Sequence, residues 1–418
     1  MQDQAFLGTE SGIAFPSADG GVDLHISTQW LHSDRDQVAS ALNLPEDLVR
    51  VTLAGVGGAF GGREDVSMHV HLCMLALHTG RPVKMVYDRN ESFLGHVHRH
   101  PAKIWFRHSA DDSGVLVKVE AKLVLDGGAY ASTTSAVLAN ACCFSVGPYR
   151  VPNALIEGWG VRTNNPPCGA MRGFGNVQTC FAAEAQMDKL AKALSLDPVE
   201  FRLLNALETG DILITGQEIT GTAPVKEVLT SLAQYPLPEP TKGELLDLPG
   251  GTGRTTDKSH VKRGVGYAAS IKNLMFSEGF DDFSEARCIV DDGEVLIKSA
   301  CVEVGQGFVT LVGQIVEETL GISDITILPV DTSIGSAGST SASRQTWMSG
   351  GAVLKACEAV VDALLLDLSS ENGVAYDKSG LNLVSKDGSH SIDISAALRG
   401  RNYDEHVTHR HKRTFPLD

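Results

Sequence analysis

The chain has 418 residues, of which 43% are apolar and 21% charged, and its formal net charge is −16 at pH 7. This length favours at least two globular domains. A net negative chain is a poor general partner for phosphates, so no nucleic acid is expected as a partner. No apolar run of membrane-spanning length occurs, so no membrane span is expected.

Two further features bear on the cellular compartment. The start, Met1-Gln2-Asp3-Gln4, lacks the basic and apolar regions of a secretory leader. The eight cysteines form no C-x-x-C pair, so their spacing offers no zinc or iron–sulfur site. We therefore expect reduced, mostly buried thiols and a cytoplasmic protein.

The first half of the chain alternates between patterns typical of strands and patterns typical of helices. A helix from Asp197 is indicated by an acidic N-cap followed by Pro198. A helix from Glu64 is indicated by acids in its first turn and by Gly80 after its end. Strands are predicted at residues 21–30, 49–55, 83–87, 102–107 and 115–125, and other helical segments at 34–42 and 177–194.

A change of composition separates two blocks of the chain. Residues 236–263 mix prolines and glycines with polar residues, which is typical of an interdomain connection. After it, strands are predicted at 294–302 and 324–329, and helices at 311–320 and 352–366. The sequence thus predicts an α+β protein with a first domain at 1–235, a linker at 236–263 and a second domain at 264–418.

The charged tail from residue 399 to 418 holds three histidines. His406, His409 and His411 suggest a metal site, but no neighbouring carboxylate or cysteine pattern supports one. A solvated polar segment is the preferred interpretation.

A glycine-rich segment, residues 55–62, lies between a predicted strand and a predicted helix. A dinucleotide-binding G-x-G-x-x-G pattern that begins at Gly55 would need glycine at position 60, where Phe60 stands. A P-loop is also excluded because no Gly-Lys-Ser/Thr follows. Three other donor-rich segments precede helices, at residues 166–175, 304–307 and 338–346. Together the four segments favour one large polyanionic ligand held by backbone N–H groups.

These segments carry a family resemblance. Residues 57–64 (GGAFGGRE), 171–175 (MRGFG) and 304–307 (VGQG) closely resemble the molybdopterin-binding portion of the xanthine dehydrogenase and aldehyde oxidase family, and residues 79–84, 88–91 and 99–101 add to it. The resemblance covers residues 1–208 and 262–365. Within the family, residues 1–8 and 95–101 look most like the separate molybdopterin-binding chain of bacterial xanthine dehydrogenases associated with purine breakdown.

The resemblance implies a cofactor and the residues that hold it. The expected cofactor is a molybdopterin, with a cytosine dinucleotide extension by bacterial analogy. Gln2 and Arg172 match catalytic positions, and Gln2 and Phe60 match residues in the second coordination shell of the molybdenum. The cofactor-binding positions are Phe60, Gly61, Arg172, Gln306, Ala342, Ser343 and Thr346.

The resemblance also implies a substrate site and a reaction. The family hydroxylates an electron-poor carbon with oxygen from water, and the cofactor supplies the difficult chemistry. Phe174 matches a ring that stacks on the substrate, and Glu64 matches an acid that hydrogen-bonds purine-like substrates. The alternative for Glu64 is a carboxylate at a helix N-terminus, favoured by the helix dipole. We therefore expect hydroxylation of a purine-like heteroaromatic carbon.

Three departures from the family pattern qualify this expectation. Asn140 falls where purine-oxidising relatives place a substrate-binding arginine. Gly173 stands where carbon monoxide dehydrogenases carry a cysteine, and Cys168 is not its substitute. A second stacking aromatic could not be assigned near Met275–Phe276. An aldehyde oxidase-like enzyme remains an alternative.

The last expectation concerns partners. The family's general base is a glutamate in a Gly-Glu-Pro or Gly-Glu-Ala context, and no such segment occurs after residue 365. We expect a truncated chain that needs a complementary C-terminal segment carrying this glutamate, an iron–sulfur subunit and an FAD subunit. The alternative is an inactive cofactor-binding fragment.

Overall fold

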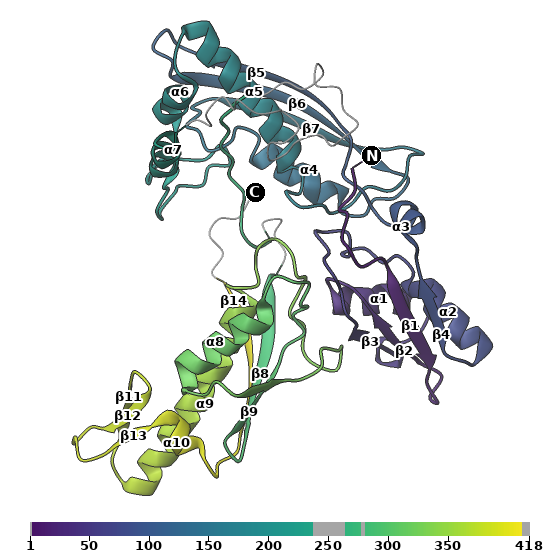
Figure 1. Ribbon diagram of the computed structural model, residues 1–418, viewed down its shortest axis with the longest axis vertical. Coiled ribbons are helices and arrows are strands. Elements are labelled where there is room, and N and C mark those ends of the chain that lie inside the picture. Colours follow the sequence, from purple (N-terminus) through teal and green to yellow (C-terminus); the bar gives the residue numbers. More distant parts are fainter. Residues whose placement is uncertain (1, 237–263, 277–280, 412–418) are drawn as a thin grey trace, which may run out of the picture.

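The computed structural model describes residues 2–236, 264–276 and 281–411. Its helices and strands are distributed over three main sheets, each covered by helices (Figure 1). The predicted α+β class is confirmed. The predicted linker, 236–263, lies almost wholly outside the described residues, and the domain boundaries stay a prediction. Within the described residues, no helix has both the length and the apolar character needed to cross a bilayer.

The N-terminal sheet has the strand order β3-β2-β1-β4. It is built from β1 (Ser11–Pro16), β2 (Val22–Ile26), β3 (Val49–Leu53) and β4 (Val83–Val86), and it packs with α1 (Leu31–Leu42) and α2 (His69–Thr79). A 3-10 turn (Glu46–Leu48) precedes β3, and α3 (Arg89–Gly95) follows β4. Alternate residues of β2, such as Val22, Leu24 and Ile26, are buried, as expected for a sheet with one face on the core.

One predicted helix begins later than the sequence indicated. The acids Glu64 and Asp65 were expected in its first turn, but α2 begins at His69. Residues 61–64 instead form a turn in which Glu64 N donates to Gly61 O. The alternative assignment of Glu64 as a carboxylate in a helix's first turn is therefore wrong.

The second sheet has the order β5-β6-β7. Its strands are β5 (Ala102–Ala110), β6 (Leu116–Gly128) and β7 (Ala154–Arg162), and its helices are α4 (Thr134–Cys143), α5 (Asn176–Leu194), α6 (Pro198–Asn205) and α7 (Val225–Ala233). The predicted cap of α6 is confirmed, because the Asp197 carboxylate accepts from Val199 N at 2.8 Å. Apolar residues of β6, α4 and α5 form the core between sheet and helices.

The C-terminal sheet has the order β10-β9-β8-β14. It comprises β8 (Phe283–Asp291), β9 (Glu294–Lys298), β10 (Ile325–Ile327) and β14 (Tyr403–Arg410), and it packs with α8 (Phe308–Leu320) and α9 (Ser349–Asn372). A small sheet of β11 (Tyr376–Ser379), β12 (Asn382–Ser385) and β13 (Ser391–Asp393) lies beyond α9, next to α10 (Ile394–Leu398).

The expectation of a solvated polar tail is wrong for residues 403–410. They form β14, which pairs antiparallel with β8 along its whole length. His409 is buried on one face of this strand, and His406 Nε2 lies 3.1 Å from the Glu285 carboxylate. Strand pairing satisfies the backbone, so alternating polar residues form an edge strand with one wet face.

The N-terminal and C-terminal sheets are joined through backbone hydrogen bonds. Leu53 N donates to Val330 O at 2.9 Å, and Thr332 N donates to Val51 O at 3.0 Å. The contact therefore extends β3 toward residues 330–332, and it brings together loops that lie more than 250 residues apart in the sequence.

Candidate functional site

A cavity of about 890 Å³ is lined by loops from all three main sheets. This volume suits a large small-molecule ligand. Nine of the eleven predicted site residues line it: Phe60, Gly61, Glu64, Asn140, Arg172, Phe174, Gln306, Ala342 and Ser343. Gln2 and Thr346 are not among its lining residues.

The backbone of the cavity loops is concentrated in the left-handed region. Phe60 has a φ of 55° and is followed by Gly61, and Gly173, Phe174 and Gly175 are all left-handed in succession. Ala342 and Ser343 form a similar pair, with φ of 49° and 52°. Residues other than glycine rarely adopt this conformation, and such strain concentrates at ligand sites. Successive left-handed residues also turn backbone N–H groups toward one side, as in anion-binding loops.

Glycine at position 61 is required by a close backbone approach. A Cβ added there would lie 2.7 Å from the carbonyl oxygen of Ala170, at a φ of +101°. The same contact brings the Arg172 loop against the Phe60 loop, where Arg172 N donates to Phe60 O at 2.8 Å. By contrast, a Cβ at Gly305 or Gly307 would meet no atom within 4 Å, so this backbone borders open space. These loops fit a ligand that backbone N–H groups approach closely.

Gln29 joins two of the cavity loops, and sequence reasoning did not identify it. Its side chain is buried, its Nε2 donates to Thr340 O at 2.8 Å, and its Oε1 accepts from Gly61 N at 3.0 Å and Arg63 N at 3.2 Å. A lone glutamine at the end of a strand carries no local signal for this role. It holds the Phe60 loop against the start of the Ser341–Ser343 loop.

Two further buried groups hold the remaining loops. The Thr340 hydroxyl donates to Val302 O at 2.9 Å, just before the residue 304–307 loop. Arg344 is fully buried, and its Nε donates to the Asp282 carboxylate at 3.0 Å while Nη1 donates to Ala337 O and Ser339 O. A buried guanidinium with this many acceptors fixes the polar run that precedes α9.

Glu64 has an unusual electrostatic position at the cavity. Burial, reinforced by the neighbouring carboxylate of Asp65, raises the pKa of Glu64 to about 8. The Ser341 hydroxyl works in the opposite direction. The side chain therefore carries a proton at neutral pH and can both donate and accept a hydrogen bond inside the cavity.

The wall around Asn140 is polar and includes a cation. Asn140 is buried on α4, and its Oδ1 accepts from Lys272 Nζ at 3.2 Å. Both side chains line the cavity, as does Phe174, which also packs on the core of the second sheet. Phe276, in the region where no aromatic could be assigned from sequence, lines the cavity next to Trp30, with ring centroids 6.0 Å apart.

Three other predicted residues, Gln306, Gln2 and Thr346, lie in or near the cavity loops. Gln306 uses its side chain within its own loop, where Nε2 donates to Val302 O and Oε1 accepts from Val304 N. Gln2 lies behind the Arg172 loop, and its carbonyl accepts from Arg99 N at 3.3 Å. Arg99 in turn donates to Met171 O and Arg172 O. Thr346 is exposed at the approach to α9.

Comparison with protein families matches two models along the chain. The molybdopterin cofactor-binding domain matches residues 1–206, and a second molybdopterin cofactor-binding domain matches residues 250–415. The loops described above lie in both matched regions. The chain therefore belongs to the molybdopterin-binding family of xanthine dehydrogenases and aldehyde oxidoreductases, as the sequence resemblance indicated.

Individual relatives are consistent with this. The chain is 34% identical over 351 residues to a probable xanthine dehydrogenase subunit of Bacillus subtilis, covering 83% of this chain and 45% of that protein. It is 41% identical over 224 residues to the nicotinate dehydrogenase large molybdopterin subunit of Eubacterium barkeri, covering 54% and 53% of the two chains. In these alignments the chain spans about half the length of the curated relatives it matches.

Solved structures share the fold. The aldehyde oxidoreductase of Desulfovibrio gigas superposes with a TM-score of 0.76 at 24% identity, over 96% of this chain and 42% of that one. A Cu,Mo-CO dehydrogenase superposes with a TM-score of 0.82 at 19% identity, over 98% and 55%.

Proposed function

We propose that this chain is part of a molybdenum hydroxylase that hydroxylates an electron-poor carbon of a purine-like heteroaromatic substrate. The observation that carries the proposal is the cavity, in which four loops with left-handed residues meet the carboxyl group of Glu64, whose pKa burial raises to about 8. Such a cavity offers backbone donors for a polyanionic cofactor and side chains for a flat, polar substrate.

The cofactor would be a molybdopterin, in its cytosine dinucleotide form. The residues that would hold it are Phe60, Gly61, Arg172, Gln306, Ala342 and Ser343, and Gln2 would act from behind the Arg172 loop. When bound, the group supplies the oxygen transfer and accepts two electrons. Gln306 would act through the conformation of its loop, since its own amide is already hydrogen-bonded there.

The chain's own residues would bind and orient the substrate. The Phe174 ring, backed by the core of the second sheet, offers a flat surface for a heteroaromatic ring. Protonated Glu64 would donate a hydrogen bond to a ring nitrogen or oxygen, and Arg172 would stabilise negative charge that develops there. Trp30 and Phe276 add apolar surface to the cavity lining.

The working enzyme would contain further chains. We propose an iron–sulfur subunit, an FAD subunit and a complementary segment that carries the general-base glutamate, all in the cytoplasm. The Eubacterium relative supports a separate segment, because its name specifies a large molybdopterin subunit. The 224 aligned residues are 54% of this chain and 53% of that relative, so the two chains are similar in length.

The test is Glu64→Ala in the assembled enzyme, with Glu46→Ala on the exposed turn before β3 as the control. We expect kcat/KM for hypoxanthine to fall by about tenfold or more, because unpairing one buried polar group costs on the order of 1–3 kcal/mol. Turnover of acetaldehyde, which has no ring substituents to bind, should change less. Equal losses would favour an aldehyde oxidase-like enzyme, and an assembled protein that holds molybdenum without turnover would favour an inactive cofactor-binding chain.

A second candidate substrate is an anionic pyridine, nicotinate. It is favoured by Lys272, whose ammonium lies on the cavity wall beside Asn140, and by the Eubacterium relative. A carboxylate would pair with this cation. Lys272→Met should then raise KM for nicotinate at least about tenfold and leave KM for hypoxanthine little changed; the same change on both substrates would contradict this assignment.

A further inference from the structure

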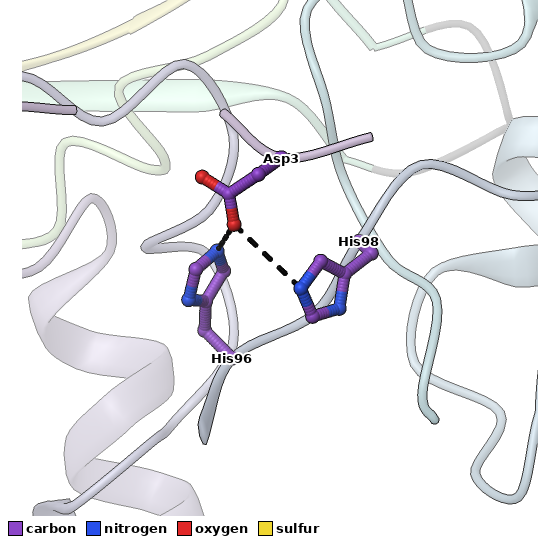
Figure 2. Close-up of side chains that lie close together, drawn as sticks. All are labelled: Asp3, His96 and His98. Carbon is purple, nitrogen blue, oxygen red and sulfur yellow. Dashed lines mark ion pairs between the residues drawn. The ribbon is translucent and has the colours of Figure 1, made fainter. Parts of the chain in front are cut away.

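A second chemical centre lies behind the cofactor-binding loops and is made of Asp3, His96 and His98 (Figure 2). One ligand atom from each side chain lies within 4.8 Å of the other two, and all three side chains are buried or largely so. Asp3 Oδ2 lies 2.9 Å from His96 Nε2 and 3.6 Å from His98 Nε2. The two histidines are alternate residues of an extended segment, which places their rings on one side.

His96 is surrounded by hydrogen-bond acceptors. Its Nδ1 faces the carbonyl oxygen of Ser92, which can only accept, and Glu10 Oε1 lies 3.4 Å from the same nitrogen. The proton of a neutral ring therefore belongs on Nδ1. The opposite nitrogen, Nε2, then presents a lone pair to the Asp3 carboxylate oxygen, an arrangement that is repulsive unless a cation or a further proton lies between them.

The Gln4 amide strengthens this argument. Its Nε2 donates to Val97 O at 3.2 Å and Ala170 O at 2.7 Å, which fixes the orientation of the amide. Gln4 Oε1 consequently points at His96 Nε2, 3.2 Å away. Two oxygen acceptors thus converge on a nitrogen that has no proton to give.

His98 also faces the Asp3 carboxylate with an unsatisfied ring nitrogen. His98 Nε2 and Asp3 Oδ2 have no hydrogen-bond partner within the described part of the chain, and the backbone carbonyl of Phe93 is the acceptor that faces the His98 ring. Buried polar atoms without partners are uncommon in folded proteins, and here they face one another across a shared space.

We propose that Asp3, His96 and His98 bind one divalent transition-metal ion, best represented by zinc, through Asp3 Oδ2 and the two Nε2 atoms. Two imidazoles and one carboxylate are a ligand set that zinc accepts, and Gln4 Oε1 is placed to be a fourth ligand. Glu10 and the Ser92 carbonyl take the second shell, where acceptors on Nδ1 orient a metal-bound histidine. This site is separate from the cofactor cavity.

The position of the centre suggests what the ion does. Asp3 belongs to the N-terminal segment with Gln2, and His98 precedes Arg99, whose guanidinium donates to Met171 O at 3.1 Å and to Arg172 O at 2.6 Å. An ion that joins Asp3 to His98 would fix this segment behind the Arg172 loop. The role is structural, because the ion's ligands do not line the cavity.

The experiment measures zinc in the full chain, purified without a polyhistidine tag and after removal of adventitious metal by a chelator. Titration with Zn²⁺ should give one tight equivalent per chain and a rise in Tm, while Mg²⁺, which prefers oxygen ligands, should give neither. His98→Gln and Asp3→Asn should abolish the tight equivalent. Glu10→Gln should retain it with an affinity about 10–100-fold lower.

The control variant is His108→Gln, which changes another buried histidine whose ring nitrogens lack partners within the described residues. It should leave zinc binding unchanged. Zinc K-edge absorption on the wild-type chain should report two imidazoles in the first shell. No tight equivalent in a folded wild-type chain, or equal zinc binding by His98→Gln, would overturn the proposal and would leave a proton on His96 as the cation between the acceptors.

Discussion

Gln29 is the residue whose replacement should most directly loosen the cofactor cavity. Its side chain makes hydrogen bonds to Thr340 O, Gly61 N and Arg63 N and a longer one to Glu64 Oε1 at 3.5 Å, and Thr340 lies more than 300 residues away in the sequence. Gln29→Ala would leave a carbonyl and two N–H groups buried without partners. Each such group costs on the order of 1–3 kcal/mol, so we expect the free energy of unfolding to fall by at least about 2 kcal/mol.

Gln29→Glu separates the hydrogen bonds that the Gln29 side chain accepts from the one that it donates to Thr340 O. The carboxylate keeps both acceptor bonds from Gly61 N and Arg63 N but has no N–H for Thr340 O. Urea denaturation should therefore rank the variants wild type, then Gln29→Glu at neutral pH, then Gln29→Ala, or place the two variants together if desolvation of the carboxylate cancels its retained bonds. Molybdenum content of the assembled enzyme should fall in both variants.

The control is Gln37→Ala, since Gln37 is an exposed glutamine on α1 whose side chain donates to Ser33 one turn earlier. This substitution should change the free energy of unfolding, measured by urea denaturation, by less than about 0.5 kcal/mol. A Gln29→Ala chain as stable as Gln37→Ala, with unchanged molybdenum content, would refute the role assigned to Gln29.

Other substitutions test the remaining parts of the site. Arg344→Met should cost about 3–5 kcal/mol in the free energy of unfolding, because it leaves the buried Asp282 carboxylate uncompensated; Arg344→Met with Asp282→Leu should recover part of the loss in thermal unfolding. Because the pKa of Glu64 is about 8 in the fold and ordinarily 4.5, its stabilising effect is complete below pH 4.5, is lost as pH rises and is absent above pH 8. Urea titrations should show that Glu64→Gln flattens this fall by at least about 1.4 kcal/mol, and equal slopes would exclude the raised pKa. Gly61→Ala should abolish molybdenum retention, since its Cβ would lie 2.7 Å from Ala170 O, whereas an unchanged metal content would exclude the close approach.

Elements with a local signal could be predicted from the sequence. The helix α6 was predicted from Asp197 and Pro198, a cap and a first-turn residue that act within three positions of each other. The helix α2 was predicted to begin five residues too early, because the acids at 64 and 65 resemble a first helical turn. Their conformation depends instead on residues distant in the sequence, since Asp65 accepts from the Ser132 hydroxyl and Glu64 lines the cavity beside Ser341.

The tail illustrates the same limit. Residues 403–410 are mostly charged or polar, with Tyr403 and Val407 as the exceptions, a composition that fits both a solvated segment and an edge strand. Pairing with β8, more than 100 residues earlier, decides between them. The convergence of the glycine loops, in contrast, could be predicted, since each loop carries its own sequence pattern and the family resemblance connects them.

The buried polar groups around the cavity hold its strained loops in place. Phe60, Phe174, Ala342 and Ser343 hold left-handed conformations that cost on the order of 1 kcal/mol or more each, and they persist only where neighbouring structure fixes them. Gln29, Thr340 and Arg344 provide that fixation, and none of their side-chain bonds reaches across the cavity to a ligand. Backbone N–H groups are thus held in place before a cofactor binds, which lowers the entropy lost on binding. Arg344, which does not line the cavity, should for this reason affect cofactor retention as strongly as the residues that do.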